Sequence, residues 1–299
     1  MSMVVFELWV PDERGVFLQR ASGWYGGHEA FGEKSKGTVF GKGDGLPGRS
    51  WASKQPEIFA SIKPPSHFVR GAAAEEAGLA GGLAIPVMRE GEVIAVLTIL
   101  TPDSDQTGLM ELWSPSTDDT SLTWRFGFYG PLDEVRTTSI STRFARDEGL
   151  PGRAWTTRLP EICTAVSDSA SGRADIAGPA HLTTGLSIPI MLGTGMQSIV
   201  TLLSTEAMPF ARVMEIWRPS EDGQTLERIQ EFYGPSDEFR DAAPGPVLTR
   251  GEGLPGQVWE TGMPQLFSRQ EGQAGPLSVA IGLPVIDDDR VTAVVMMLS

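Results

Sequence analysis

The sequence is poor in the features that anchor or cross-link many secreted and membrane proteins. Its 299 residues include a single cysteine, Cys163, which excludes an intrachain disulfide and a thiol metal cluster. No apolar stretch approaches the ~20 residues of a membrane-spanning helix. The opening strand-like segment carries Glu7 and has no basic flank, unlike a signal peptide. We therefore expect a cytoplasmic protein that contacts no membrane.

Positive charge is also scarce, because no lysine follows Lys63 and the formal net charge is −14. The negative balance grows along the chain, from −2 over residues 1–104 to −5 over 105–208 and −7 over 209–299. Such a surface repels phosphodiester backbones, and no basic stripe with interleaved aromatics occurs, so we expect no nucleic-acid partner. We interpret the acidity as serving solubility, with an acidic docking surface as the alternative.

Residue patterns for metal binding and catalysis are missing as well. The three histidines, His28, His67 and His181, have no partner at metal-ligand spacing. The segment Gly43–Gly48 matches a dinucleotide-binding pattern, but no parallel βαβ pattern surrounds it, and a turn followed by a helix start explains its glycines. No nucleophile elbow appears. We expect no metal, no cofactor and no enzymatic activity.

What the sequence does contain is one stretch three times. Gly-Leu-Pro-Gly-x-x-Trp occurs at Gly45–Trp51, Gly149–Trp155 and Gly253–Trp259, with a start-to-start spacing of 104 residues. The same interval relates the only three tyrosines, and strict spacing of this kind indicates an internal repeat. We predict three domains: 1–104, 105–208 and 209–299, the last shortened between Pro264 and Pro284.

Each repeat has the same predicted order of elements. An alternating segment ended by proline, such as Val5–Pro11, and a second segment that ends in Tyr-Gly predict a hairpin of half-buried strands. The repeated stretch predicts a short helix, and a short third strand follows. Residues 68–79 predict a further helix in the first repeat, a helix that the shortening removes from the third. Two strands close each repeat. The pattern predicts an α+β fold with a central antiparallel sheet and short helices or loops on one face.

This order of motifs closely resembles the GAF domains of bacterial sensor proteins. The resemblance rests on Leu-Trp-x-Pro, Gly-Glu-Gly-Leu-Pro-Gly-x-x-Trp, Pro-x-x-apolar, Phe-x-Arg and Ile-Pro-Val, and it runs through Leu8–Leu97 in the first repeat. It implies three tandem GAF-like units, each with a small-molecule pocket between the sheet and the covering loops and helices, used for sensing and often in a dimer. GAF domains normally begin and end with helices, whereas these repeats begin and end on strands.

Without terminal helices, one face of each sheet needs another cover, because large exposed apolar patches are rare on soluble monomers. We expect the three units to bury these faces on one another or across a homodimer. An alternative is strand exchange, in which the last strand of one repeat pairs with the first strand of the next. The sequence leaves these arrangements open.

The candidate ligand-binding residues are aromatic and arginine side chains near the expected pocket. The tryptophans of the repeated stretch also fit a core role, and the arginines also fit a solvated surface. The candidates are Tyr25, Trp51, Phe68, Arg70, Tyr129, Trp155, Arg173, Tyr233 and Trp259.

We interpret the chain as a non-catalytic small-molecule-binding or regulatory sensor module that acts through a separate signalling or scaffold protein. We expect it to form a homo-oligomer, in the form of a dimer. The alternative is a protein-interaction scaffold whose pockets are filled by side chains and hold no ligand.

Overall fold

The computed structural model describes the chain in several stretches. These are residues 4–61, 69–102, 104, 106, 108–168, 172–178, 180–193, 195–234, 237–241, 243–269 and 277–299. Every structural statement below concerns these residues.

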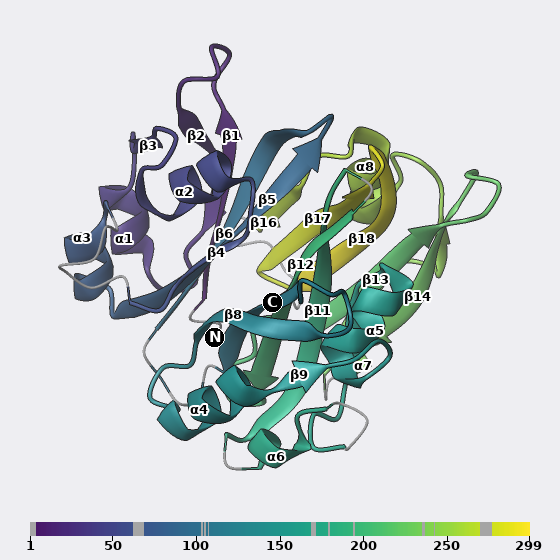
Figure 1. The fold of residues 1–299 in the computed structure, drawn as a ribbon. Coiled ribbons are helices and arrows are strands. Elements are labelled where there is room, and N and C mark those ends of the chain that lie inside the picture. Colours follow the sequence, from purple (N-terminus) through teal and green to yellow (C-terminus); the bar gives the residue numbers. More distant parts are fainter. Residues whose placement is uncertain are drawn as a thin grey trace.

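Three six-stranded antiparallel sheets make up the fold, one from each repeat (Figure 1). We call each sheet with its helices a unit. Unit 1 contains β1 (Val5–Pro11), β2 (Leu18–Trp24), α1 (Glu29–Lys34), β3 (Val39–Phe40), α2 (Gly45–Ser53), β4 (Glu57–Phe59), α3 (Gly71–Glu76), β5 (Leu79–Arg89) and β6 (Glu92–Pro102).

Units 2 and 3 repeat this order, except that the described residues between β16 and β17 of unit 3 contain no helix. Unit 2 contains β7 (Leu109–Pro115), β8 (Leu122–Phe128), α4 (Asp133–Ser141), β9 (Arg143–Phe144), α5 (Gly149–Thr157), β10 (Glu161–Cys163), α6 (Ala174–Ala177), β11 (Leu182–Leu192) and β12 (Gly195–Thr205). Unit 3 contains β13 (Val213–Pro219), β14 (Leu226–Phe232), α7 (Asp237–Asp241), β15 (Val247–Leu248), α8 (Gly253–Thr261), β16 (Gln265–Ser268), β17 (Val279–Asp287) and β18 (Arg290–Leu298).

The strand order is the same in each sheet. In unit 1 it is β3-β2-β1-β6-β5-β4, so the first and last strands of a unit lie side by side at the centre. Because β6 pairs with β1, β12 with β7 and β18 with β13, each closing strand stays in its own sheet, and the described strands show no exchange between units. The three equivalent sheets and the few short helices confirm the α+β fold predicted from the repeat.

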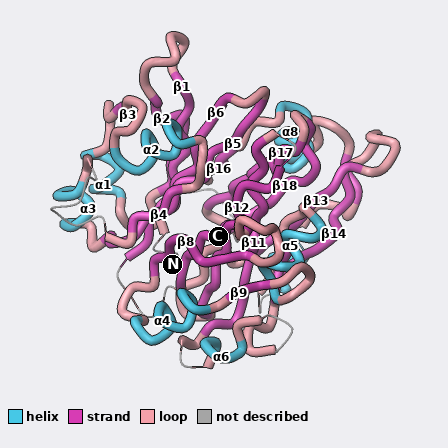
Figure 2. Tube along the Cα trace, viewed as in Figure 1, coloured by secondary structure: helices cyan, strands magenta, loops and turns pink. Residues whose placement is uncertain are grey.

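The first strand of each unit is buried on both faces, which corrects the prediction of a half-buried strand. In β1, Phe6 and Leu8 point to one core, while Val5 and Trp9 belong to another. The helices cover only one of these two faces, and Figure 2 shows them around the outside of the strands. The other face must be covered by something else.

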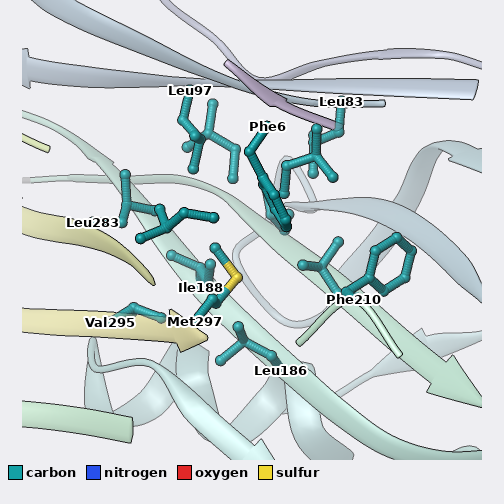
Figure 3. Close-up of a cluster of buried hydrophobic side chains, with 14 of the residues drawn as sticks. Phe6, Leu83, Leu97, Leu186, Ile188, Phe210, Leu283, Val295 and Met297 are labelled. Atoms are coloured by element: carbon teal, nitrogen blue, oxygen red, sulfur yellow. The ribbon is translucent and has the colours of Figure 1, made fainter. Parts of the chain in front are cut away.

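The cover is supplied by the other two units. One hydrophobic core collects buried side chains from all three sheets, among them Leu83 of unit 1, Ile188 of unit 2 and Leu283 of unit 3 (Figure 3). Phe210, from the segment between units 2 and 3, packs into the same core. The expectation that the units bury their bare faces on one another is therefore met within a single chain.

Contacts between units run in one direction and close into a ring. Strand β4 contacts β7 and β8, β10 contacts β13 and β14, and β16 contacts β1 and β2, while β17 packs against both β5 and β11. A head-to-tail contact that closes after three steps is the arrangement of a cyclic trimer, realised here by three repeats of one chain.

Polar contacts follow the same direction. Arg158, at the end of α5, donates to both carboxylate oxygens of Asp287 in the closing hairpin of unit 3, at 2.9 and 2.7 Å. Arg89, in the closing hairpin of unit 1, donates to the carbonyl oxygen of Thr261 at the end of α8, at 2.7 Å. The helix of the repeated stretch in one unit thus meets the closing hairpin of the next.

The repeated stretch begins a helix in every unit, as predicted. Helices α2, α5 and α8 start at the first glycine of the stretch, and these glycines adopt positive φ of 57°, 62° and 60°. The helix predicted over residues 68–79 is shorter, and α3 covers Gly71–Glu76. The loss of a helix from the shortened part of unit 3 concerns residues that are partly outside the described stretches. None of the described helices is long and apolar enough to cross a membrane.

Candidate functional site

A glutamate lies buried at the centre of each sheet, on the face that the helices cover. Glu7, Glu111 and Glu215 occupy the third position of β1, β7 and β13 and are 0%, 0% and 3% exposed. They are spaced by the 104-residue repeat. A buried carboxylate must be neutralised and hydrogen-bonded to be tolerated, so its partners define the site.

In unit 1 the partner is Arg70, at the N-terminal boundary of α3. Its two terminal nitrogens each donate to one oxygen of Glu7 at 2.7 Å, the bidentate geometry that makes such pairs strong. Arg70 also donates to Ser35 at 2.9 Å. Tyr25 donates its hydroxyl to Glu7 at 2.9 Å, and Arg20 donates to that hydroxyl.

Unit 2 repeats the cluster with small changes. Arg173, at the N-terminal boundary of α6, donates to Glu111 at 2.9 Å and to Ser139 at 2.5 Å. Tyr129 donates to Glu111 at 3.0 Å. Trp113 donates its indole N–H to the other carboxylate oxygen at 3.2 Å. The arginine again comes from the segment that covers the sheet.

Unit 3 builds the cluster with an arginine from a different element. Arg228 lies on β14, at the repeat position that Arg20 holds in unit 1, and donates to Glu215 at 3.1 Å. Tyr233 and Trp217 donate to the same carboxylate at 2.6 and 2.8 Å. A buried carboxylate therefore occurs together with a guanidinium and a phenol in all three units.

The three tyrosines share one electrostatic environment. Burial raises the pKa of Tyr25, Tyr129 and Tyr233 far above the ordinary value for tyrosine, and the charge of the adjacent glutamate raises each pKa further. Because the neutral phenol donates to a carboxylate, removal of its proton would place two anions side by side. These tyrosines act as fixed hydrogen-bond donors.

In units 1 and 2, side chains fill the space between the sheet and its covering helices. A void able to hold a ligand would leave accessible surface on the side chains around it. In unit 1, Trp9 is 0% and Arg70 only 7% exposed, and the Arg70 guanidinium carbon lies 4.7 Å from the ring centre of Phe31. In unit 2, Arg173 is 1% exposed. The arginine thus occupies the place where the GAF resemblance implies a ligand.

Five of the nine candidate residues predicted from the sequence contact one of the buried glutamates. Tyr25 with Arg70 and Tyr129 with Arg173 share a glutamate, and Tyr233 contacts the third. Phe68 lies outside the described residues.

The tryptophans of the repeated stretch lie elsewhere, in the core under α2, α5 and α8. Each is covered on its solvent side by a cation three residues before the stretch. Lys42, Arg146 and Arg250 lie 4.9, 3.9 and 4.1 Å from the ring centres of Trp51, Trp155 and Trp259, respectively. These positions support a packing role, since a cation over an indole face is stabilising.

Sequence reasoning missed the glutamates and Arg228. The signal for the glutamates was present, because the 104-residue interval that relates the tyrosines also relates Glu7, Glu111 and Glu215. The signal for Arg228 was weak, because its equivalents are Arg20 and Trp124 and the repeat alone does not mark it as a replacement for Arg70.

The comparison with known families gives a match that covers the first unit and the start of the second. Residues 5–114 match the GAF domain family. The match runs from β1 into β7, so it does not mark the boundary between units 1 and 2. The comparison with curated proteins found no match.

Solved structures similar to the chain include several GAF domains. The A. aeolicus nlh2 GAF domain in an inactive state is 23% identical, with a TM-score of 0.28, over 33% of this chain and 58% of that one. The GAF domain of a phosphoenolpyruvate-protein phosphotransferase from Coxiella burnetii is 18% identical, with a TM-score of 0.27, over 32% and 55%. A type II free methionine-R-sulfoxide reductase from Thermoplasma acidophilum is 16% identical, with a TM-score of 0.26, over 32% and 60%. The chain thus spans little more than half the length of each of these three.

Proposed function

We propose that this chain, with its three GAF-like units in tandem, is a non-catalytic regulatory module that acts through a separate protein. GAF domains generally bind small molecules or regulate signalling proteins. Of these two roles, we propose that the three clusters of glutamate, arginine and tyrosine, called the outer clusters below, serve the second. They would then be parts of a protein-interaction scaffold in which side chains fill the pockets that the GAF resemblance implies.

The observation that carries this proposal is the ion pair at the centre of each site. A ligand entering unit 1 would have to separate Arg70 from Glu7, and a separated pair would leave an uncompensated buried charge at a cost of about 3–5 kcal/mol. The same argument applies to Arg173 and Glu111. The carboxylate, guanidinium and phenol groups of these clusters also form hydrogen bonds with one another, which supports a non-catalytic role.

A ligand screen on the full chain tests the proposal. Nucleotides and aromatic acids are titrated in thermal-shift measurements, and a denatured extract of the purified protein is searched for bound metabolites by mass spectrometry. A ligand at a hundredfold excess over its Kd would add about 2.7 kcal/mol of stability. We expect that no compound acts through the buried cluster of unit 2, so that any shift seen in the wild-type chain is kept in Glu111→Gln.

The control is Glu134→Gln, which changes an exposed glutamate on α4 of the same unit. A compound whose shift is lost in Glu111→Gln and kept in Glu134→Gln would contradict the proposal, because it would show that the cluster binds a ligand.

The expected homodimer remains a proposal of its own. One reason to expect a homodimer was that each sheet needed a cover for its bare face, but the chain covers those faces itself. Sedimentation velocity of the full chain distinguishes a monomer from a dimer.

A further inference from the structure

A cavity of about 250 Å³ lies where units 2 and 3 meet. Thr184 of β11 lines it from unit 2, and Phe232 of β14 and Phe239 of α7 line it from unit 3. Glu206 and Arg212, near the two ends of the segment that joins the units, also line it. A cavity of this size is close to the lower end of the range for small-molecule sites.

The cavity exists because this junction differs from its equivalent between units 1 and 2. There, Phe128 lies on Gly81, so closely that a Cβ on the glycine would come within 2.4 Å of the ring. The residues in the same places at the second junction are Phe232 and Thr184. Thr184 has the side chain that Gly81 lacks, so Phe232 cannot take the same position, and it remains partly exposed beside the cavity.

The positive charge of the cavity is specific to this junction. Arg212 stands immediately before β13, where the other units have Val4 and Gly108 before β1 and β7. Arg212 and Glu206 are both exposed at the cavity, and across the described stretches neither side chain forms a recorded ion pair. One arginine and one glutamate thus line the same space as two phenylalanines.

We propose that this cavity binds a free α-amino acid with an apolar or aromatic side chain. The α-carboxylate pairs with Arg212, the α-ammonium group pairs with Glu206, and the side chain packs on Phe232 and Phe239. A simple carboxylate would meet the repulsion of Glu206, and a simple amine that of Arg212, so the zwitterion fits the pair of charges best. A larger cavity of about 760 Å³ lies beside this one and shares Thr183, Thr205 and Glu206 with it.

This inference goes beyond the proposed function, since the junction cavity is separate from the three outer clusters and binding there leaves the buried ion pairs intact. Because the lining residues come from two units, a bound amino acid stabilises the junction between them. The ligand would therefore act on the arrangement of the units.

Isothermal titration calorimetry on the full chain tests the proposal, with L-phenylalanine and L-leucine as probes. Phenylacetate and phenethylamine, which each lack one of the two charges, are the matched ligand controls. We expect both amino acids to bind, and each control ligand to bind at least tenfold more weakly than L-phenylalanine.

Two variants assign the site. Arg212→Gln and Glu206→Gln should each weaken L-phenylalanine binding at least tenfold, while Arg218→Gln and Glu221→Gln, which change exposed residues of unit 3 outside the cavity, should leave it unchanged. Circular dichroism verifies that every variant is folded. Failure of both amino acids to bind up to their solubility limit overturns the proposal, as does binding that Arg212→Gln and Glu206→Gln leave at the wild-type affinity. Neither result bears on the outer clusters, which the Glu111→Gln screen tests.

Discussion

Arg70 and Glu7, 63 residues apart in the chain, form a bidentate ion pair between the sheet and the segment that covers it in unit 1. The pair attaches α3 to β1 and fills the space between them. Unit 2 keeps both partners, whereas unit 3 keeps the carboxylate and takes its guanidinium from β14, which indicates that the pairing, and not a particular arginine position, is what the fold requires.

Replacement of Arg70 by methionine should destabilise the chain strongly. Arg70→Met removes the only bidentate partner of Glu7 that the described residues provide and leaves a buried carboxylate next to apolar groups. We expect a loss of about 3–5 kcal/mol in the free energy of unfolding, measured by urea denaturation.

The matched control for this change is Arg49→Met. The Arg49 side chain is 44% exposed and pairs with Glu57 at 3.4 Å, so we expect a loss of about 1 kcal/mol or less. The double variant Glu7→Leu with Arg70→Met should recover much of the stability, because it leaves no buried charge. Equal losses in Arg70→Met and Arg49→Met would show that the buried pair does not stabilise the fold.

The three tyrosines should make the chain sensitive to alkali. Their pKa is raised in the folded state, so the folded chain holds these protons more tightly than the unfolded chain does. The stabilisation is fully present below the ordinary tyrosine pKa of about 10 and is lost as the pH rises above it. Each tyrosine should lower the free energy of unfolding by up to about 1.4 kcal/mol per pH unit there.

Urea denaturation at a series of alkaline pH values measures this slope, and near-ultraviolet absorbance reports tyrosinate directly. Since the chain has only three tyrosines, Tyr129→Phe should remove about a third of the slope. Tyrosinate absorbance that develops near pH ~10 while the chain is still folded would be inconsistent with the buried clusters.

The repeat made much of the fold predictable. Residues that recur every 104 positions, such as Trp51 and Trp155, mark the same place in each unit, and local patterns around them predicted the hairpins and the helix starts. The short strand β3 and the helix α1 were not predicted, because their few residues lie in a polar stretch without clear periodicity.

The candidate site was less predictable because its partners are distant in sequence. Period-two alternation placed Glu7 on the face opposite Phe6, and an isolated polar residue there normally indicates solvent. Burial of that face depends on Arg70, and no local pattern reveals a contact across 63 residues. The ring of units could not be predicted from the sequence either, because it depends on which apolar sheet faces pack against each other.

The last glycine of the repeated stretch should not tolerate a side chain. A Cβ on Gly152 would lie 2.3 Å from the carbonyl oxygen of Ala145, and the equivalent distances at Gly48 and Gly256 are 2.2 and 2.5 Å. Since the neighbour is backbone, relief requires movement of the chain. We expect Gly152→Ala to lower the free energy of unfolding by about 1–3 kcal/mol, measured by urea denaturation.

Gly178 provides the matched control in the same unit. A Cβ on Gly178 would meet nothing within 4 Å, so Gly178→Ala should have little effect on stability. If the two alanine variants were equally stable, the close approach of α5 to the preceding loop would not be the reason for this glycine.

The shared core should make the three units unfold together. Leu283 is 1% exposed in the core that all three sheets share, and its strand β17 packs against β5 and β11. Leu283→Ala should therefore cost about 2–5 kcal/mol and shift one cooperative transition as a whole. Tryptophan fluorescence and far-ultraviolet circular dichroism should report the same midpoint, because no unit can unfold without exposing the inner faces of the other two. Separate transitions, with only one displaced by Leu283→Ala, would mean that each unit is stable without the core it shares.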